Sequence, residues 1–175
     1  MFNDDDEDFD LDGYRKLPIF KKGQEIVKLV QQIVDLIPED NEELNYFKRF
    51  ILEDAYMLTA KIVNAEGGDL YDIRMENAAI IRKSAHSLMI QYHSLVQFGF
   101  EHAEYYMMVR QLIEEYRLLF IDWVATFDKT NYIIDRWGLF NPPGVGPFDV
   151  DIDDQIGDDN SDFFDYFNND DDDDE

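Results

Sequence analysis

The 175-residue chain contains no cysteine. This absence excludes disulfides, thiolate zinc sites and catalysis by a thiol nucleophile. The chain also lacks a Gly-x-Ser-x-Gly sequence and a glycine-rich phosphate loop before a helix. Nothing in it therefore predicts a serine hydrolase or a nucleotide-binding enzyme.

Long apolar runs are absent as well. No stretch approaches the roughly 18 consecutive apolar residues that predict a membrane-spanning helix. The first residues, from Met1 to Asp5, are acidic where a secretory signal carries positive charge. We therefore expect a cytoplasmic protein that makes no use of the membrane.

Lysine and arginine are missing from both ends of the chain. Residues 1–13 contain seven acids and residues 149–175 contain fourteen, together 21 of the 40 acids. Residues 14–148 hold the other 19 acids and all 15 bases, so their net charge is −4 out of a total of −25. No basic stripe is available to hold a phosphate backbone, and we expect no direct binding to nucleic acid.

Four segments between these acidic ends have apolar residues at alternating steps of three and four. The spacing predicts helices over about 17–36, 40–66, 69–98 and 101–127. The second has the most continuous face, which comprises Leu44, Phe47, Ile51, Ala55, Leu58, Ile62 and Ala65. The fourth has two neighbouring rows, one beginning at Tyr105 and one at Tyr106, which indicates packing on two sides.

Four predicted helix ends depend on particular residues. Asp40 with Glu43 fits a capping box, and Asp69 is the expected N-cap of the third helix. Gly67–Gly68 is expected to end the second helix in the left-handed conformation, and Gly99 is expected to end the third.

The short connections force neighbouring helices to be antiparallel. We therefore predict an all-α fold, an antiparallel up-down-up-down four-helix bundle with disordered acidic N- and C-terminal tails. The expected divisions are a tail at 1–13, the bundle at 14–140, and a Pro/Gly linker with an acidic-aromatic tail at 141–175. Within the bundle unit, Trp137, Leu139 and Phe140 are expected to anchor a packed C-terminal segment.

Metal and catalytic sites find little support. Helical bundles often bind iron through Glu-x-x-His, but none of the three histidines, His86, His93 and His102, has this motif. The pair Arg82 and His86 shares a helix face, yet its spacing differs from that of small helical ribonucleases. We predict no catalytic residue, no metal ligand and no cofactor.

Two groups of residues are candidate interaction sites. One group surrounds the second connection and comprises Glu66, Asp69, Asp72, Arg74 and Glu76. It predicts a docking surface or an ion site, although acids at a helix N-terminus are also explained by the helix dipole, and we favour that explanation.

The other group interleaves aromatics with acids in the C-terminal tail and comprises Phe163, Phe164, Tyr166 and Phe167. That composition is typical of a motif that docks into a basic, apolar groove. The alternative is a tail that only solubilises the protein and excludes nucleic acid.

The helical core resembles a known family. Residues 60–78, with Asp128–Asn131 and Trp137–Phe140, are similar to an uncharacterised four-helix-bundle family of Bacteroidota bacteria over about residues 17–140. More distantly, Ala65-Glu66-Gly67 resembles the Asn-Ile-Ala-Glu-Gly element of the 23S rRNA intervening-sequence bundle proteins. Those are related to the diversity-generating-retroelement accessory bundle protein, which forms barrel-shaped pentamers with a basic nucleic-acid-binding surface.

The resemblance implies a bundle and a homo-oligomer, but it does not carry nucleic-acid binding to this chain. Asn64 lies one position closer to Glu66 than in the distant element, and Gly68-Asp69 stands where those proteins tend to be basic. Acidic tails around a core of net charge −4 repel phosphate.

Three functions agree with the sequence. The first is a non-enzymatic protein-interaction bundle whose acidic tails contact a basic protein partner. The second is an acidic nucleic-acid mimic or a chaperone for a basic protein. The third is a metal- or ligand-binding helical-bundle enzyme.

Overall fold

The computed structural model describes residues 13–150, and this part of the chain is all-helical, with four long helices and no strand. The helices are α1 (Pro18–Val34), α2 (Glu42–Glu66), α3 (Tyr71–Gln97) and α4 (Tyr106–Val124). Two short 3-10 helices, η1 (Gly13–Lys16) and η2 (Ala103–Tyr105), precede α1 and α4. The prediction of an all-α fold with four helices is confirmed.

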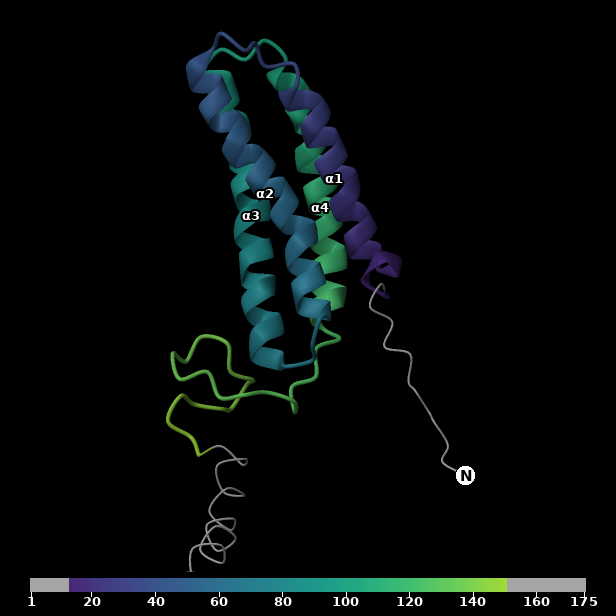
Figure 1. Cartoon of the computed structure of the whole chain (residues 1–175), viewed down its shortest axis with the longest axis vertical. Helices are drawn as coiled ribbons and strands as arrows, with labels where there is room; N and C mark the ends of the chain where they lie inside the picture. The colour runs from purple at the N-terminus through teal and green to yellow at the C-terminus, as the bar shows by residue number, and fades with distance from the viewer. Residues whose placement is uncertain (1–12, 151–175) are drawn as a thin grey trace, which may run out of the picture.

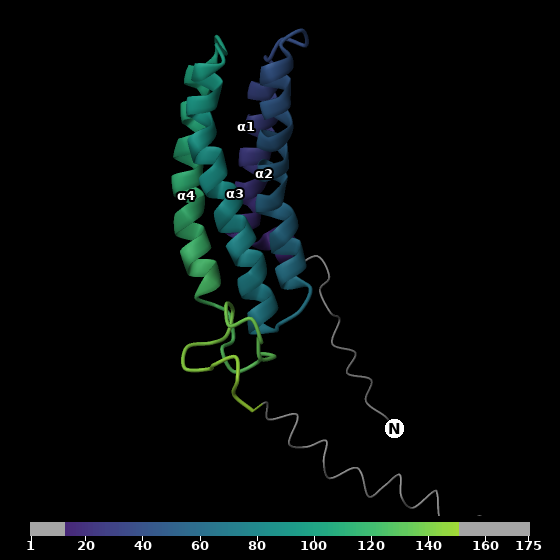
Figure 2. The same cartoon turned by 90° about the vertical axis from the view of Figure 1, so that its left-hand side faces the viewer.

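The four helices lie side by side along their lengths (Figure 1). The α1–α2 and α3–α4 connections lie at one end, and the α2–α3 connection lies at the other, together with the segment that follows α4. Helix α3 lies between α2 and α4 (Figure 2), and α1 packs against α2 and α4. The contact of α3 with α2 is extensive, whereas its contact with α4 is the smallest between neighbouring helices.

Helix α2 buries the stripe that its sequence predicts. Six of the seven predicted positions are buried, and Phe47 is half-buried. Leu58 on α2 and Leu88 on α3 have no exposed surface at all. Mixed steps of three and four place these side chains on one face of a helix, which must then pack against its neighbours.

The buried face of α4 is drawn from both predicted rows. Tyr106, Val109, Ile113, Tyr116 and Trp123 are buried, whereas Tyr105 is exposed. The reason is that Tyr105 belongs to the 3-10 turn and α4 begins at Tyr106, five residues later than Glu101. Leu36 is exposed for a similar reason, because α1 ends at Val34.

Two of the four predicted helix ends lie at a neighbouring residue, and a third lies where predicted but has another conformation. Asn41, and not Asp40, caps α2, since its side-chain oxygen accepts a hydrogen bond from the Leu44 amide at 3.0 Å. Leu70, and not Asp69, is the N-cap of α3, and its side chain makes no capping bond. Gly67 follows the last residue of α2 as predicted, but it is right-handed, with a φ of −74°, and Gly68 is not left-handed either.

Gly99 ends α3 as predicted, with a φ of +75°. The Phe100 amide donates to the Leu95 carbonyl at 2.9 Å and the Gly99 amide to the Val96 carbonyl at 3.1 Å, which is the Schellman pattern. Phe100 and Leu95 are both buried and complete the apolar contact of this motif.

Candidate functional site

The predicted interaction residues at the α2–α3 connection divide into two sets. Glu66 and Arg74 form one set, because their side chains make an ion pair of 2.5 Å and are only 24% and 15% exposed. The same Glu66 oxygen accepts a hydrogen bond from the Trp123 indole at 2.8 Å, and the Arg74 guanidinium lies 4.3 Å from the centre of the Phe127 ring. Glu66 and Arg74 therefore tie α2, α3 and the end of α4 together.

Asp69, Asp72 and Glu76 form the second set, which faces the segment after α4. The Asp72 carboxylate accepts a hydrogen bond from the Ile133 amide at 3.0 Å. The Tyr71 amide, which a capping side chain would otherwise satisfy, donates to the Asn131 carbonyl at 2.7 Å. Asp69 and Glu76 are exposed. The chain after α4 thus supplies the N-terminal cap of α3 in place of Asp69.

Residues 128–150 lie across this end of the helices (Figures 1 and 2). Asp135 organises them, because its two carboxylate oxygens accept hydrogen bonds from the amides of Trp137, Leu139 and Phe140 at 2.8–2.9 Å. These bonds, with that from Phe140 foremost, hold the pKa of Asp135 below its usual range. Gly138 takes a φ of +72° within the turn. We call residues 135–141 the Asp135 loop.

The Asp135 loop is closed on its other side by Asn141. The Asn141 side chain accepts from the Asp135 amide at 2.7 Å and donates to the Asp135 carbonyl at 2.9 Å. Arg136 then donates to the carbonyls of Pro147 and Asp149 at 3.1 and 2.8 Å, which brings the following residues back onto the loop. Hydrogen bonds therefore define the shape of the Asp135 loop.

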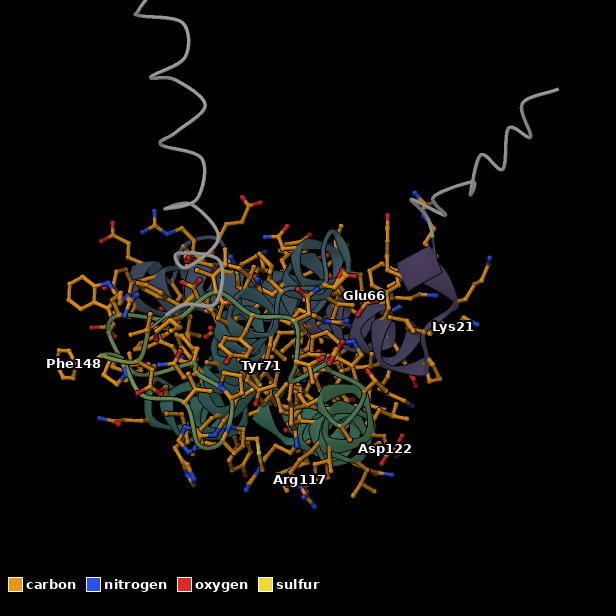
Figure 3. The ribbon with its side chains drawn as sticks, turned by 90° about the horizontal axis from the view of Figure 1, so that it is seen from below. Lys21, Glu66, Tyr71, Arg117, Asp122 and Phe148 are labelled. Carbon is orange, nitrogen blue, oxygen red and sulfur yellow. The ribbon has the colours of Figure 1, made fainter. Side chains whose placement is uncertain are left out.

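The large side chains of this segment point outward, against the prediction. Trp137 is 91% exposed and Leu139 is 74% exposed, so neither anchors the segment, and Phe140 is half-buried. The buried side chains of residues 128–150 are Ile134 and Pro142, and Tyr132 packs on the core. Phe148 is 94% exposed and projects from the edge of this end of the molecule (Figure 3). The hydrogen bonds of Asp135 occupy the turn backbone and leave Trp137 and Leu139 outside.

A pocket of about 410 Å³ separates the Asp135 loop from α3. Acidic and apolar side chains line it together: Asp72, Ile73, Glu76, Asp135, Trp137, Leu139 and Phe140. This surface combines the exposed acids of the α2–α3 junction with exposed large apolar groups. It is the arrangement that sequence reasoning missed. An Asp two residues before Trp-Gly, followed by Asn141, was the available signal of an organised turn.

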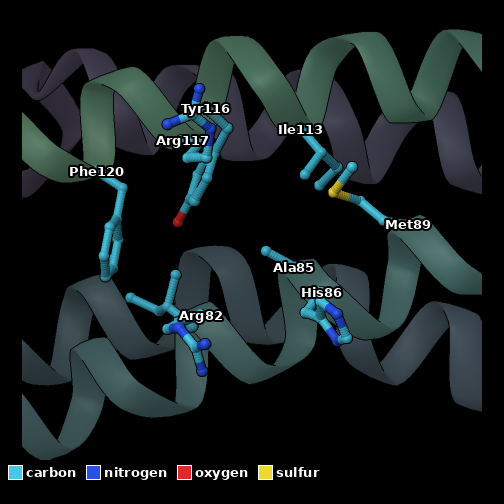
Figure 4. A pocket seen from close by; sticks show the side chains of 9 residues that line it. Arg82, Ala85, His86, Met89, Ile113, Tyr116, Arg117 and Phe120 are labelled. Atoms are coloured by element: carbon cyan, nitrogen blue, oxygen red, sulfur yellow. The ribbon is translucent and has the colours of Figure 1, made fainter.

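A second pocket, of about 180 Å³, lies between α3 and α4 (Figure 4). Its lining is apolar except at the rim, and comprises Ile81, Arg82, Ala85, His86, Met89, Ile113, Tyr116, Arg117 and Phe120. Arg82 and His86 therefore share one face, as their spacing predicts. Arg117 pairs with the exposed Glu114 at 2.9 Å.

Residues 13–150 contain no group of three or more His, Asp or Glu side chains that could hold a metal ion. The most strongly shifted titratable groups in this part of the chain are core tyrosines. Burial raises the pKa of both Tyr106 and Tyr116, and Asp54 adds to the effect at Tyr106. The Tyr116 hydroxyl donates to the Leu58 carbonyl at 2.8 Å, so it joins α4 to α2.

Four predicted interaction residues, Phe163, Phe164, Tyr166 and Phe167, lie outside the described residues, as do most acids of both tails. Within residues 13–150, no helix is long and apolar enough to cross a bilayer. Comparisons with protein-family models, with curated proteins and with solved structures found no match.

Proposed function

We propose that this protein is a non-enzymatic, cytoplasmic interaction module, in which an antiparallel up-down-up-down bundle presents one acidic end to a basic protein partner. The observation that carries the proposal is Trp137, which is 91% exposed on a loop fixed by three hydrogen bonds to Asp135. The resemblance to the Bacteroidota bundle family and a homo-oligomeric state remain predictions within this proposal.

Tryptophan is the side chain that most often dominates the binding energy of an interface. Exposed tryptophans on loose segments must be ordered on binding, which costs free energy. The Asp135 loop removes much of that cost, because its backbone is already held by Asp135 and Asn141. Trp137 and Leu139 are therefore suited to enter an apolar groove on a partner.

Charge defines the rest of the partner surface. Asp72, Glu76 and Asp135 line the pocket beside Trp137. The chain continues from this same end into residues 149–175, which contain fourteen acids and no base. A strong local field of one sign accelerates encounter with a surface of the opposite sign. The partner should accordingly carry an apolar groove with a basic rim.

The test compares full-length variants for capture of partners from the native cytoplasm. Trp137→Ser with Leu139→Ser should lose the captured partner, while the matched pair Leu118→Ser with Ile121→Ser, which are exposed on α4, should retain it. A partner retained by the Trp137/Leu139 variant would contradict the proposal. It would favour an acidic mimic or chaperone, whose binding depends on charge alone.

The contribution of the tail is measured with the captured partner. Replacing Phe163, Phe164, Tyr166 and Phe167 by Ser keeps every charge, so the on-rate should persist while the complex dissociates faster. Replacing Asp170–Asp174 by Asn should lower the on-rate and its dependence on salt. If the aromatic replacement leaves affinity unchanged, the tail aromatics do not contact the partner.

A further inference from the structure

Most of α3 lies in the longest acid-free stretch of this acidic chain. Residues 77–100, 24 positions, include no Asp or Glu and carry Arg82, Lys83 and two histidines. Arg82 and Lys83 are exposed and make no hydrogen bond or ion pair within residues 13–150. The exposed surface of α3 at Arg82 and Lys83 is therefore a locally cationic region on a molecule of net charge −25, and on neighbouring α4 Arg117 is paired with Glu114.

The pocket between α3 and α4 lies within this region. Its floor is apolar, and Arg82, His86 and Arg117 stand around it (Figure 4). Its volume of about 180 Å³ is enough for one phenyl ring, since benzene occupies a protein cavity of about 150 Å³. The pocket thus matches a ligand with a single aromatic ring and negative charge on both sides.

We infer that this pocket binds the chain's own C-terminal segment Asp162-Phe163-Phe164-Asp165. Here two phenylalanines stand between two aspartates, so one ring can fill the pocket while Asp162 and Asp165 face Arg82 and Arg117. The second aromatic pair, Tyr166-Phe167, has an aspartate on its N-terminal side only and is followed by Asn168. The first pair is therefore the better match to a pocket with cations on both helices.

The geometry of the chain permits this contact. The described residues end at Val150, at the end of the molecule where α3 begins. From Asp72 to Ala85 the helix advances 13 residues, or about 20 Å. The 13 residues from Val150 to Phe163 can span up to about 44 Å. A tethered segment that reaches its site has an effective concentration of the order of mM, so weak intrinsic affinity is sufficient.

Bound in this way, the tail neutralises the cationic face of α3 and withholds its aromatics from other proteins. This consequence rests on the proposed function, because a partner would then compete with the α3–α4 pocket for the tail. The self-contact itself requires no partner and can be measured in the purified protein alone.

The experiment uses the absence of cysteine. Asn168→Cys in the full chain carries the only thiol, so a nitroxide spin label attaches at one position. The readout is loss of the methyl signal of Met89, which lines the pocket, compared with that of Met57 on α2. We expect selective loss of the Met89 signal and its recovery as salt rises.

Matched variants separate the parts of the inference. The Met89 signal should return with Phe163→Ser/Phe164→Ser and with Arg82→Glu/Arg117→Glu, and should stay lost with Tyr166→Ser/Phe167→Ser. Arg82→Gln, which removes one charge and leaves the Arg117–Glu114 pair intact, should restore part of the signal.

Three results would overturn the inference. The first is an unaffected Met89 signal, and the second is an equal loss of signal at Met89 and Met57. The third is loss of the Met89 signal in a mixture where one chain carries the spin label and another carries the isotope-labelled methionines. The last result would assign the pocket to a second copy's tail. None of them affects the role proposed for Trp137, and retention of a partner by the Trp137/Leu139 variant leaves the self-contact intact.

Discussion

Glu66 on α2 links three helices, since one of its carboxylate oxygens binds both Arg74 on α3 and Trp123 on α4. Glu66→Gln retains an acceptor for the indole but removes the charge opposite a guanidinium that is only 15% exposed. We expect a loss of about 1–3 kcal/mol in the free energy of unfolding, because a charge in a largely buried site is left uncompensated. Urea denaturation followed by circular dichroism measures it.

Glu114→Gln is the control for this prediction. It breaks an ion pair with Arg117 of which both side chains are at least half exposed. Such pairs contribute less than about 1 kcal/mol, so the midpoint should barely move. Equal losses of unfolding free energy in the two variants would mean that the Glu66 contacts stabilise the protein no more than an exposed ion pair does.

Asp135 gives the loop a defined dependence on pH. Hydrogen bonds from Phe140, Trp137 and Leu139 lower its pKa in the folded chain. The carboxylate therefore stabilises the loop fully above the unfolded pKa of about 3.9, and this contribution is lost as pH falls through the lower folded pKa. The protection factors of these three amides, which allow for the slower intrinsic exchange in acid, should fall as pH is lowered while the amides of α2 stay protected.

Asp135→Asn should reproduce the acid effect at neutral pH, because an amide offers one acceptor oxygen where the carboxylate offers two. Asp128→Asn is the matched change, since Asp128 also accepts two hydrogen bonds, both from Thr130, outside the loop. If Asp128→Asn exposes the amides of 137–140 equally, Asp135 does not organise the loop.

Among the elements, helix interiors follow from the sequence more closely than helix ends do. The interior of α2 is set by apolar spacing alone, and all its predicted core positions are buried or half-buried. Its predicted cap, Asp40, is wrong by one position, because Asn41 is an equally good cap and only the folded backbone shows which residue faces the Leu44 amide. The start of α3 depends on Asn131, 60 residues away, which local reasoning cannot reach.

Core positions on two elements give a direct test of this packing. Leu58→Ala on α2 and Leu88→Ala on α3 should each cost about 2–5 kcal/mol, because both side chains are wholly buried. Leu118→Ala, at a position 57% exposed on α4, should change stability by less than about 0.5 kcal/mol. Losses below about 1 kcal/mol at both buried positions would contradict the assignment of the core.

The backbone of α1 approaches α2 closely at Gly23. A methyl group there would lie 2.9 Å from the Thr59 Cγ2 atom and 3.5 Å from the Tyr116 ring. Gly23→Ala should therefore destabilise the protein, even though alanine favours a helix by up to about 1 kcal/mol over glycine.

Thr59→Ser removes the clashing methyl and keeps a hydroxyl for the bond to the Tyr56 carbonyl. In this background Gly23→Ala should become neutral or stabilising, and a double-mutant cycle should give coupling of about 1 kcal/mol or more. Additive effects of the two changes would show that Thr59 does not limit the approach of the helices.

At the scale of the whole molecule, charge and packing are separated along the chain. Residues 14–148 carry every base and a net charge of −4, and the apolar core of the described residues lies within them. A chain shortened to residues 13–150 should therefore still unfold cooperatively, losing only the small stabilisation that the tail supplies by occupying the α3–α4 pocket. A shortened chain without helical circular dichroism would contradict this.

The candidate site contains one feature that the sequence predicts and one that it does not. The acids of the α2–α3 junction were predictable, because they cluster within eleven positions of the sequence, from Glu66 to Glu76. The exposure of Trp137 was not, because tryptophan beside leucine and phenylalanine normally indicates burial. The difference comes from three backbone amides that donate hydrogen bonds to the Asp135 carboxylate. They hold a tight turn in which the Trp137 and Leu139 side chains point into solvent.

The two tryptophans occupy opposite environments, so their intrinsic fluorescence reports on two different parts of the protein. Trp123 is buried against Glu66, whereas Trp137 stands in solvent. Emission should therefore contain a blue component that follows unfolding of the helices and a red component that follows events at the Asp135 loop. Acrylamide, which is neutral, should quench the red component more strongly than iodide does, because the acids around Trp137 repel an anion. Occupation of the loop by a partner would then be visible as loss of acrylamide quenching, without any label.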